Sequence, residues 1–177
     1  MFLYLAMIDS DADKSKFEIL YSEYKNLMYY TANRILHNSS DAEDVVHQAF
    51  LKVIEILDTI SSPRCHKTRA LLVTITEHKA IDLYREKQRR NVLPLAEEYI
   101  GAAPAAEIER LAERDTLAAA IASLPPRYRS VLLLRYDCGY SNAEIANILD
   151  TTEPNVRKLI QRAKEKLSAA LSGMEEP

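Results

Sequence analysis

Residues 141–167 read SNAEIANILDTTEPNVRKLIQRAKEKL, and this stretch indicates two helices joined by a tight turn. Ser141 followed by Glu144 has the pattern of a capping box, which predicts that a helix starts there. Thr152 is expected to cap a second helix, because Pro154 is tolerated only in the first turn of a helix.

The second helix of this pair combines an apolar face with a basic one. Apolar side chains recur at helical spacing on one side: Val156, Leu159, Ile160, Ala163 and Leu167. The other side carries cations and amides: Asn155, Arg157, Lys158, Gln161, Arg162, Lys164 and Lys166. A short helix, a turn and a basic second helix are typical of a helix-turn-helix, which lays its second helix in the DNA major groove. An ordinary helical hairpin with a solvated charged face is the alternative, but the two amides suit base edges.

The composition is that of a soluble helical protein. Of the 177 residues, 47% are hydrophobic and 28% are charged, and only 3 are glycine. No stretch shows the alternating pattern of a strand, so an all-α fold is predicted. This length is sufficient for one large domain or two small ones.

The net charge of −3 conceals two basic blocks. Residues 64–90 carry 8 basic and 3 acidic side chains, and residues 154–177 carry 5 basic and 3 acidic ones. Residues 1–63 and residues 91–153 each carry 5 basic and 10 acidic side chains. Basic blocks of this kind favour local contact with nucleic acid in spite of the negative total. The acidic remainder is expected to limit indiscriminate DNA binding by the free protein.

No motif for catalysis, for a metal or for a cofactor is present in the sequence. It has no glycine-rich phosphate loop and no nucleophile with an assignable base, so neither an enzyme nor a cofactor is predicted. Cys65 and Cys138 lack metal-ligand spacing and are expected to be free thiols in a reducing cytoplasm.

The N-terminal residues MFLYLAM are apolar, but they are too short for a signal peptide. No segment is predicted to insert into a membrane. Met7 is an alternative start to Met1, because a polar stretch follows it.

Three long helices are predicted in the first 90 residues, over about residues 14–37, 40–57 and 67–90. Ser40 and Glu43 have the pattern of a second capping box at the start of the middle helix. Its outward face is expected to hold Asp44, His47, Gln48, Leu51, Lys52 and Glu55. The apolar Leu51 on that polar face is a modest sign of a partner surface, and a solvated charged face is the alternative.

The third of these helices ends in the basic segment DLYREKQRR. Its cations lie within two turns and have a tyrosine among them: Arg85, Lys87, Arg89 and Arg90, with Tyr84. Cations interleaved with an aromatic ring suit a nucleic-acid backbone with a base stacked alongside. The helix dipole also favours basic residues at a C-terminus, so the segment by itself leaves both interpretations open.

Residues 91–106 are the predicted flexible linker, because two prolines and a glycine interrupt the helical pattern. This boundary divides the chain into a first helical domain, residues 1–90, and a second one, residues 107–177, that contains the helix-turn-helix.

Together these features resemble bacterial RNA polymerase sigma factors of the extracytoplasmic-function (ECF) class, in the sigma-70 family. Residues 41–53, DAEDVVHQAFLKV, resemble the family's helix that docks on the polymerase clamp. Residues 75–90, ITEHKAIDLYREKQRR, resemble the helix that reads and melts the −10 element. Residues 123–136, SLPPRYRSVLLLRY, and residues 141–167 resemble the domain that reads the −35 element. The resemblance spans roughly residues 15–170 in the family's order.

The resemblance implies core RNA polymerase and promoter DNA as partners, together with an anti-sigma factor. Polymerase would be contacted through Asp41, Asp44, His47, Gln48 and Lys52. The −10 DNA would be met by His78, Lys79, Arg85, Lys87, Arg89 and Arg90. The best candidates for the −35 groove are Asn155, Arg157, Lys158, Gln161 and Arg162.

The sequence departs from the family pattern in the −10 helix. Leu71 stands where a tryptophan is usual, and Glu77 with His78 replaces a common Arg-Asn pair. Glu77 places a carboxylate where the family often has a cation, so the −10 contacts are expected to differ. These departures leave open a sigma-like protein that does not melt promoters. The other alternative is a helix-turn-helix regulator that acts without polymerase: the second domain does not exclude it, but such a regulator has no need of the helix over residues 41–53.

Overall fold

The computed structural model describes residues 1–90 and 116–174, and every element in these two ranges is a helix, which confirms the predicted all-α fold. The chain divides into two compact units, each considered by itself below. The predicted linker, residues 91–106, and the predicted start of the second domain at residue 107 lie outside the described residues.

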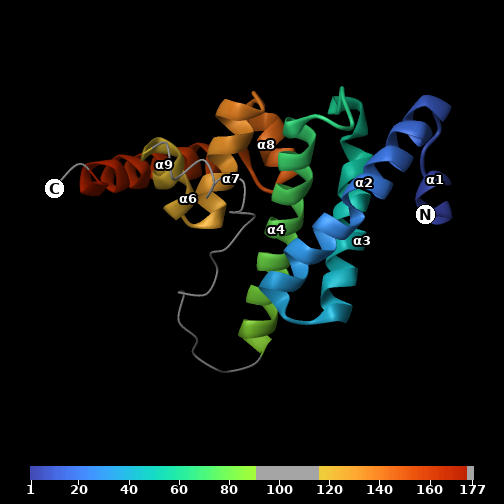
Figure 1. Ribbon diagram of the computed structural model, residues 1–177, viewed down its shortest axis with the longest axis horizontal. Helices are drawn as coiled ribbons and strands as arrows, with labels where there is room; N and C mark the ends of the chain where they lie inside the picture. The colour runs from blue at the N-terminus through green and yellow to red at the C-terminus, as the bar shows by residue number, and fades with distance from the viewer. Residues whose placement is uncertain (91–115, 175–177) are drawn as a thin grey trace. The chain divides into compact units, whose positions relative to one another are not determined.

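Three long helices form the body of the first unit within residues 1–90: α2 (Asp11–Leu36), α3 (Ser39–Glu55) and α4 (His66–Arg90). They run alternately up and down, and each packs against the other two (Figure 1). A short helix, α1 (Phe2–Leu5), precedes them, and a 3-10 turn, η1 (Leu57–Thr59), follows α3. The third long helix, α4, therefore runs beside the first, α2, and in the same direction.

Apolar side chains at three- and four-residue spacing fill the core of this bundle. Large side chains that are almost completely buried include Phe17, Leu20, Met28, Val45, Phe50, Leu71, Leu72 and Ile75. The rings of Phe17 and Phe50 meet edge to face, with their centroids 5.7 Å apart. Each such burial is worth about 1.5–3 kcal/mol, so the core decides which side of each helix faces outward.

The start of α3 differs from the prediction. Its N-cap is Asn38, whose side-chain oxygen accepts a hydrogen bond from the backbone N–H of Asp41 at 3.0 Å. The predicted capping box of Ser40 and Glu43 is therefore wrong. Asparagine caps a helix as well as serine does. His37, which ends α2 in the left-handed conformation (φ 50°), turns the chain so that Asn38 is the residue at the helix end.

The second unit is built around α9 (Glu153–Met174). Three shorter helices pack against α9: α6 (Thr116–Ser123), α7 (Pro126–Leu132) and α8 (Asn142–Ile148). Between α7 and α8 the chain passes through a π-helical turn, η3 (Leu133–Asp137), and through Gly139, whose φ of 83° suits glycine.

The helix-turn-helix predicted from residues 141–167 is present as α8 and α9. The Ser141 Oγ accepts from the Glu144 N–H at 3.2 Å, and the Glu144 carboxylate accepts from the Ser141 N–H at 2.7 Å. This confirms the capping box. Asp150 takes the left-handed conformation (φ 47°) in the turn, which Asp adopts more readily than most residues. Pro154 lies in the first turn of α9, as predicted.

The corrected cap of α3 can be tested by two neighbouring substitutions. Asn38→Ala removes the side chain that caps the helix and should lower the free energy of unfolding by about 1 kcal/mol. Ser40→Ala, the matched control, removes an exposed hydroxyl from the first turn and should change it far less. Urea denaturation of the two variants measures the difference. An equal loss in both variants would contradict the assignment of Asn38 as the cap.

The capping box of α8 predicts a dependence of stability on pH. Hydrogen bonds from Ser141, first from its side chain and then from its backbone N–H, lower the pKa of Glu144. A folded-state pKa below the unfolded one stabilises the fold at neutral pH. That contribution is lost as the pH falls through the folded-state pKa.

We therefore expect the stability advantage of the unchanged protein over Glu144→Gln, which stays neutral, to shrink between about pH 7 and about pH 3. Urea denaturation of both proteins across this range measures it. An advantage that stays constant with pH would show that the ionised carboxylate contributes nothing to the cap.

Candidate functional site

The outward side of α9 carries every residue that the sequence predicts to contact the −35 DNA. All five are exposed: Asn155, Arg157, Lys158, Gln161 and Arg162. Between them, Val156, Leu159 and Ala163 are buried. The predicted two-sided character of this helix is therefore confirmed, while the contact with DNA remains a prediction.

Two of these exposed side chains bond within their own helix. Arg157 pairs with Glu153, one turn earlier, at 2.7 Å, and the amide of Gln161 donates to the Glu165 carboxylate at 3.1 Å. Pairs of this kind on a helix surface are worth only about 0.2–0.5 kcal/mol. Both side chains can therefore exchange these partners for a phosphate or a base at little cost.

A groove of about 350 Å³ beside this face adds residues that the sequence did not single out. Its lining comes from η3, α8 and α9: Arg135, Tyr136, Asn142, Arg157, Ile160, Gln161 and Lys164. Tyr136 is 60% exposed, and the Lys164 ammonium lies 5.3 Å from the centre of its ring. Arg135 donates to the backbone carbonyl of Tyr140 at 3.0 Å, which orients its guanidinium. The sequence feature that could have pointed to this groove is the pair Arg135 and Tyr136, which lies just before the turn into α8.

The outward face of α3 agrees with the prediction at four of its six positions. Asp44, His47, Gln48 and Glu55 are exposed, whereas Leu51 is half-buried. This exposed face belongs to the segment that resembles the polymerase-docking helix of the family.

The prediction that Lys52 also faces outward is wrong. Lys52 is only 5% exposed, and its ammonium pairs with the Glu55 carboxylate at 2.9 Å. It follows the buried Val45 and Ala49 at seven- and three-residue spacing, which places its stem on the inner face of α3. A long aliphatic stem can be buried while its charged end reaches a partner at the edge.

The first turn of α3 meets the basic end of α4. Both carboxylate oxygens of Asp41 accept hydrogen bonds from the Lys87 ammonium. The Lys87 side chain is 48% exposed, so this ion pair contributes no more than about 1 kcal/mol. The structure thus joins two residues that the sequence assigned to different partners, polymerase and −10 DNA.

The exposed cations of α4 lie in its last two turns. Arg85, Lys87, Arg89 and Arg90 are exposed, whereas His78 and Lys79 are half-buried. This region therefore offers its positive charge mainly from the C-terminal end of the helix.

Glu77 does not present its carboxylate on this surface as expected. It is only 3% exposed, and it ends a run of residues, 71–77, that are all buried. Leu71, which replaces the family's usual tryptophan, is also buried, at 1% exposure. Both departures from the family pattern are therefore buried.

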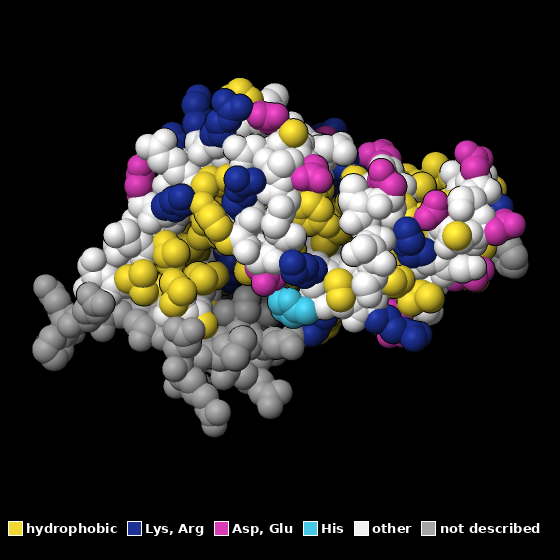
Figure 2. All heavy atoms as spheres, turned by 90° about the horizontal axis from the view of Figure 1, so that it is seen from above, with side chains coloured by type: hydrophobic (Ala, Val, Ile, Leu, Met, Phe, Trp, Pro, Cys, Tyr) yellow, Lys and Arg dark blue, Asp and Glu magenta, His cyan; other side chains and the backbone are white. Residues whose placement is uncertain are grey.

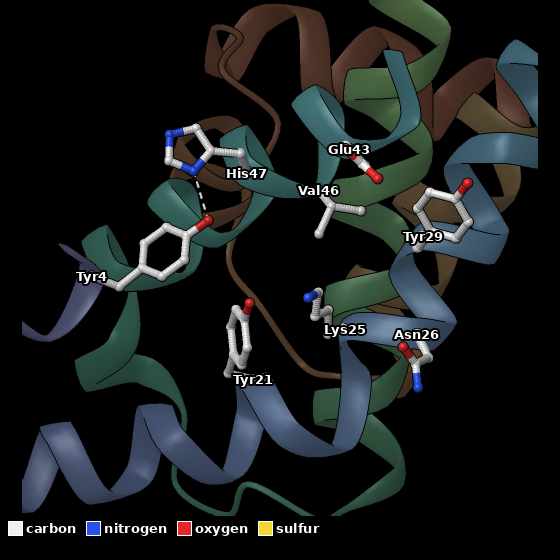
Figure 3. A pocket seen from close by; sticks show the side chains of 8 residues that line it. All are labelled: Tyr4, Tyr21, Lys25, Asn26, Tyr29, Glu43, Val46 and His47. Atoms are coloured by element: carbon white, nitrogen blue, oxygen red, sulfur yellow. Dashed lines mark hydrogen bonds between the residues drawn. The ribbon is translucent and has the colours of Figure 1, made fainter. Parts of the chain in front are cut away.

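A second pocket, of about 470 Å³, lies between α2 and α3. Figure 3 shows its lining residues, which come from α1, α2 and α3: Tyr4, Tyr21, Lys25, Asn26, Tyr29, Glu43, Val46 and His47. At one end the Tyr4 hydroxyl is hydrogen-bonded to Nδ1 of His47, with the two atoms 2.6 Å apart. Nothing in the spacing of the sequence predicted that the first residues would reach the outward face of α3.

On one face of the molecule, charged side chains of both signs are mixed (Figure 2). On the face in Figure 2, Lys and Arg side chains are interspersed with acidic and apolar ones. Because the net charge is −3, any contact with nucleic acid depends on local groups such as the end of α4 and the outward side of α9.

Within residues 1–90 and 116–174, none of the helices has the length and apolar character that crossing a membrane requires. The same ranges contain no group of three or more His, Cys, Asp or Glu side chains placed to hold a metal ion.

A helical protein with a basic, exposed second helix in a helix-turn-helix belongs to the class of DNA-binding transcription factors. Two family models match this chain: "Sigma-70 region 2" over residues 20–90, and "Sigma-70, region 4" over residues 114–167. Together they cover well over half of its length. The chain therefore belongs to the sigma-70 family, as a sigma factor of the ECF class, and its function is promoter-specific initiation of transcription.

Curated relatives of the ECF class align with nearly the whole of this chain. The ECF RNA polymerase sigma factor SigW of Bacillus subtilis is 27% identical over 171 residues, which cover 90% of each protein. The ECF RNA polymerase sigma factor SigL of Mycobacterium tuberculosis is 26% identical over 162 residues, covering 90% of this chain and 91% of SigL. Among solved structures, CnrH in complex with the cytosolic domain of CnrY is 28% identical, covers 89% of this chain and 88% of that one, and has a TM-score of 0.39.

Proposed function

We propose that the two domains of this sigma factor divide its work as the family resemblance implies. Residues 1–90 bind core RNA polymerase and the −10 element, and residues 107–177 bind the −35 element, with residues 91–106 as the linker. The observation that carries the proposal is the exposed basic side of α9, whose buried side packs against the rest of its domain.

In the first domain, polymerase is contacted by the outward face of α3, through Asp44, His47 and Gln48, with Asp41 at its edge. Lys52 is not part of this surface, because it is buried. The −10 DNA is met by the end of α4: Arg85, Lys87, Arg89 and Arg90, with His78 and Lys79 further back. The link between Asp41 and Lys87 supports a continuous surface in which polymerase and DNA contacts adjoin.

In the second domain, the N-terminal half of α9 reads bases in the −35 major groove. Asn155, Arg157 and Lys158 lie in its first two turns, and Gln161 and Arg162 follow one turn later. The groove beside α9 adds Arg135 and Tyr136 as candidates for contact with the DNA backbone.

The remaining partner is an anti-sigma factor that covers these surfaces in the inactive state. The protein acts in the cytoplasm, where polymerase and promoter DNA are found. Its family consists of transcription regulators, and we propose that it catalyses no reaction of its own.

One observation keeps a second function under consideration, namely a sigma-like protein that binds polymerase but does not melt promoters. Leu71 replaces the usual tryptophan, and it is buried. The other rival, a helix-turn-helix regulator without polymerase, gives no role to the exposed face of α3.

Purified full-length protein mixed with bacterial core RNA polymerase should co-elute with it in gel filtration. The complex should then initiate transcription from specific promoters in a genomic pool. Co-elution without specific initiation would support the sigma-like protein that lacks promoter melting. Absence of co-elution would contradict the proposed role of α3.

The −35 assignment is tested on the promoter that this assay yields. Lys158→Ala should weaken binding to its −35 element by about 1–3 kcal/mol if the side chain reads a base, and the same holds for Arg157→Ala. Lys166→Ala is the matched control. It removes the same charge about 12 Å further along α9, where the ammonium lies 5.6 Å from the Tyr128 ring.

Electrophoretic mobility shifts with matched and altered −35 sequences measure these effects. If Lys158→Ala binds like the unchanged protein, Lys158 is not a reader. If Lys166→Ala loses as much affinity, the loss comes from charge alone rather than from position.

A further inference from the structure

The residues before the first long helix contribute to the core of the first domain. Tyr4 is 8% exposed, and its ring centroid lies 5.4 Å from that of Phe17 and 5.9 Å from that of Phe50. Both phenylalanines are completely buried. Tyr4 therefore closes the outer edge of an aromatic cluster, and this packing holds its side chain in one place.

From that fixed position, the Tyr4 hydroxyl reaches the outward face of α3. Its oxygen lies 2.6 Å from Nδ1 of His47, and the two rings are tilted against each other with centroids 5.3 Å apart. Burial first, and the neighbouring Tyr21 second, raise the pKa of Tyr4. The hydroxyl thus keeps its proton at neutral pH and can donate it to Nδ1.

A hydrogen bond accepted at Nδ1 fixes the state of a neutral imidazole. The ring proton then resides on Nε2, which becomes a hydrogen-bond donor. Figure 3 shows that this second nitrogen points away from Tyr4. The His47 side chain is exposed, so Nε2 is accessible to a partner protein that docks on α3.

We propose that Tyr4 is a positioning residue for polymerase binding, which holds His47 with its Nε2–H directed outward to a hydrogen-bond acceptor on the polymerase, such as a carboxylate or a backbone carbonyl. A side chain that is already held in its bound orientation loses less freedom on association, so it binds more tightly than a mobile one. The inference rests on the proposed contact between α3 and core RNA polymerase.

Two matched substitutions separate this role from a general effect on the fold. Tyr4→Phe keeps the ring in the aromatic cluster and removes the bond to His47. Tyr24→Phe makes the same change at a residue that is also 8% exposed, but whose hydroxyl donates to the backbone carbonyl of Pro63 at 3.0 Å. Tyr4→Phe should weaken binding to core RNA polymerase roughly three- to tenfold, the cost of ordering one freed side chain on association, and Tyr24→Phe should not.

A double-mutant cycle tests whether Tyr4 acts through His47. His47→Ala should weaken polymerase binding, and Tyr4→Phe should cause no further loss in that background. Nitrogen NMR of the His47 imidazole reports which ring nitrogen carries the proton. This proton position would not change if Tyr4 served only to stabilise the fold. The unchanged protein should show the proton on Nε2, and Tyr4→Phe should show a mixture of the two tautomers.

The outcomes separate the inference from the function on which it rests. If the unchanged full-length protein does not bind polymerase, the proposed role of α3 fails and the inference fails with it. If it binds, the inference alone is overturned by any of three results. These are equal or tighter binding by Tyr4→Phe, an equal loss in Tyr24→Phe, and a full additional loss from Tyr4→Phe in the His47→Ala background.

Discussion

Burial of one face of each helix is the constraint on which the rest of this structure depends. In the first domain, Phe17 and Phe50 meet in the core, and the helices that carry them cannot rotate without exposing one of the rings. In the second domain, Val156 and Ala163 hold α9 against its neighbours in the same way. Each surface proposed to bind a partner is the opposite face of a helix fixed by such burial, so the core determines what the surface presents.

The proposed binding faces are already organised by weak contacts. Arg157 pairs with Glu153 on α9, Lys87 pairs with Asp41 at the end of α4, and His47 is bonded to Tyr4. The two ion pairs are solvent-exposed, so they orient side chains without holding them strongly. A partner that offers a phosphate or a carboxylate can replace them. The Tyr4 bond differs, because its donor is anchored in the core and is expected to persist in the bound state.

The departures from the family pattern in α4 have a structural meaning. Glu77 and Leu71 are buried, at 3% and 1% exposure, whereas the cations of its last two turns are exposed. Neither of these two residues belongs to the exposed group of cations at the end of α4. The exposed cations at the C-terminal end of α4 are present in spite of these differences, and they suit a DNA-binding role for this segment.

The sequence by itself determined the helical class, the helix-turn-helix, and the exposed basic side of α9. These features follow from local rules: the spacing of apolar residues, the reciprocal bonds of Ser141 with Glu144, and the restriction that proline places on a helix. It failed at Lys52 and at the cap of α3. A lysine whose stem is buried at the edge of the core cannot be distinguished from an exposed lysine by residue type, and two neighbouring residues can both serve as caps.

Only the tertiary structure decided which distant residues meet. Asp41 lies 46 residues before Lys87, and Tyr4 lies 43 before His47, yet both pairs are in contact. Such contacts depend on how the helices pack against one another, and no local pattern of the chain encodes that packing.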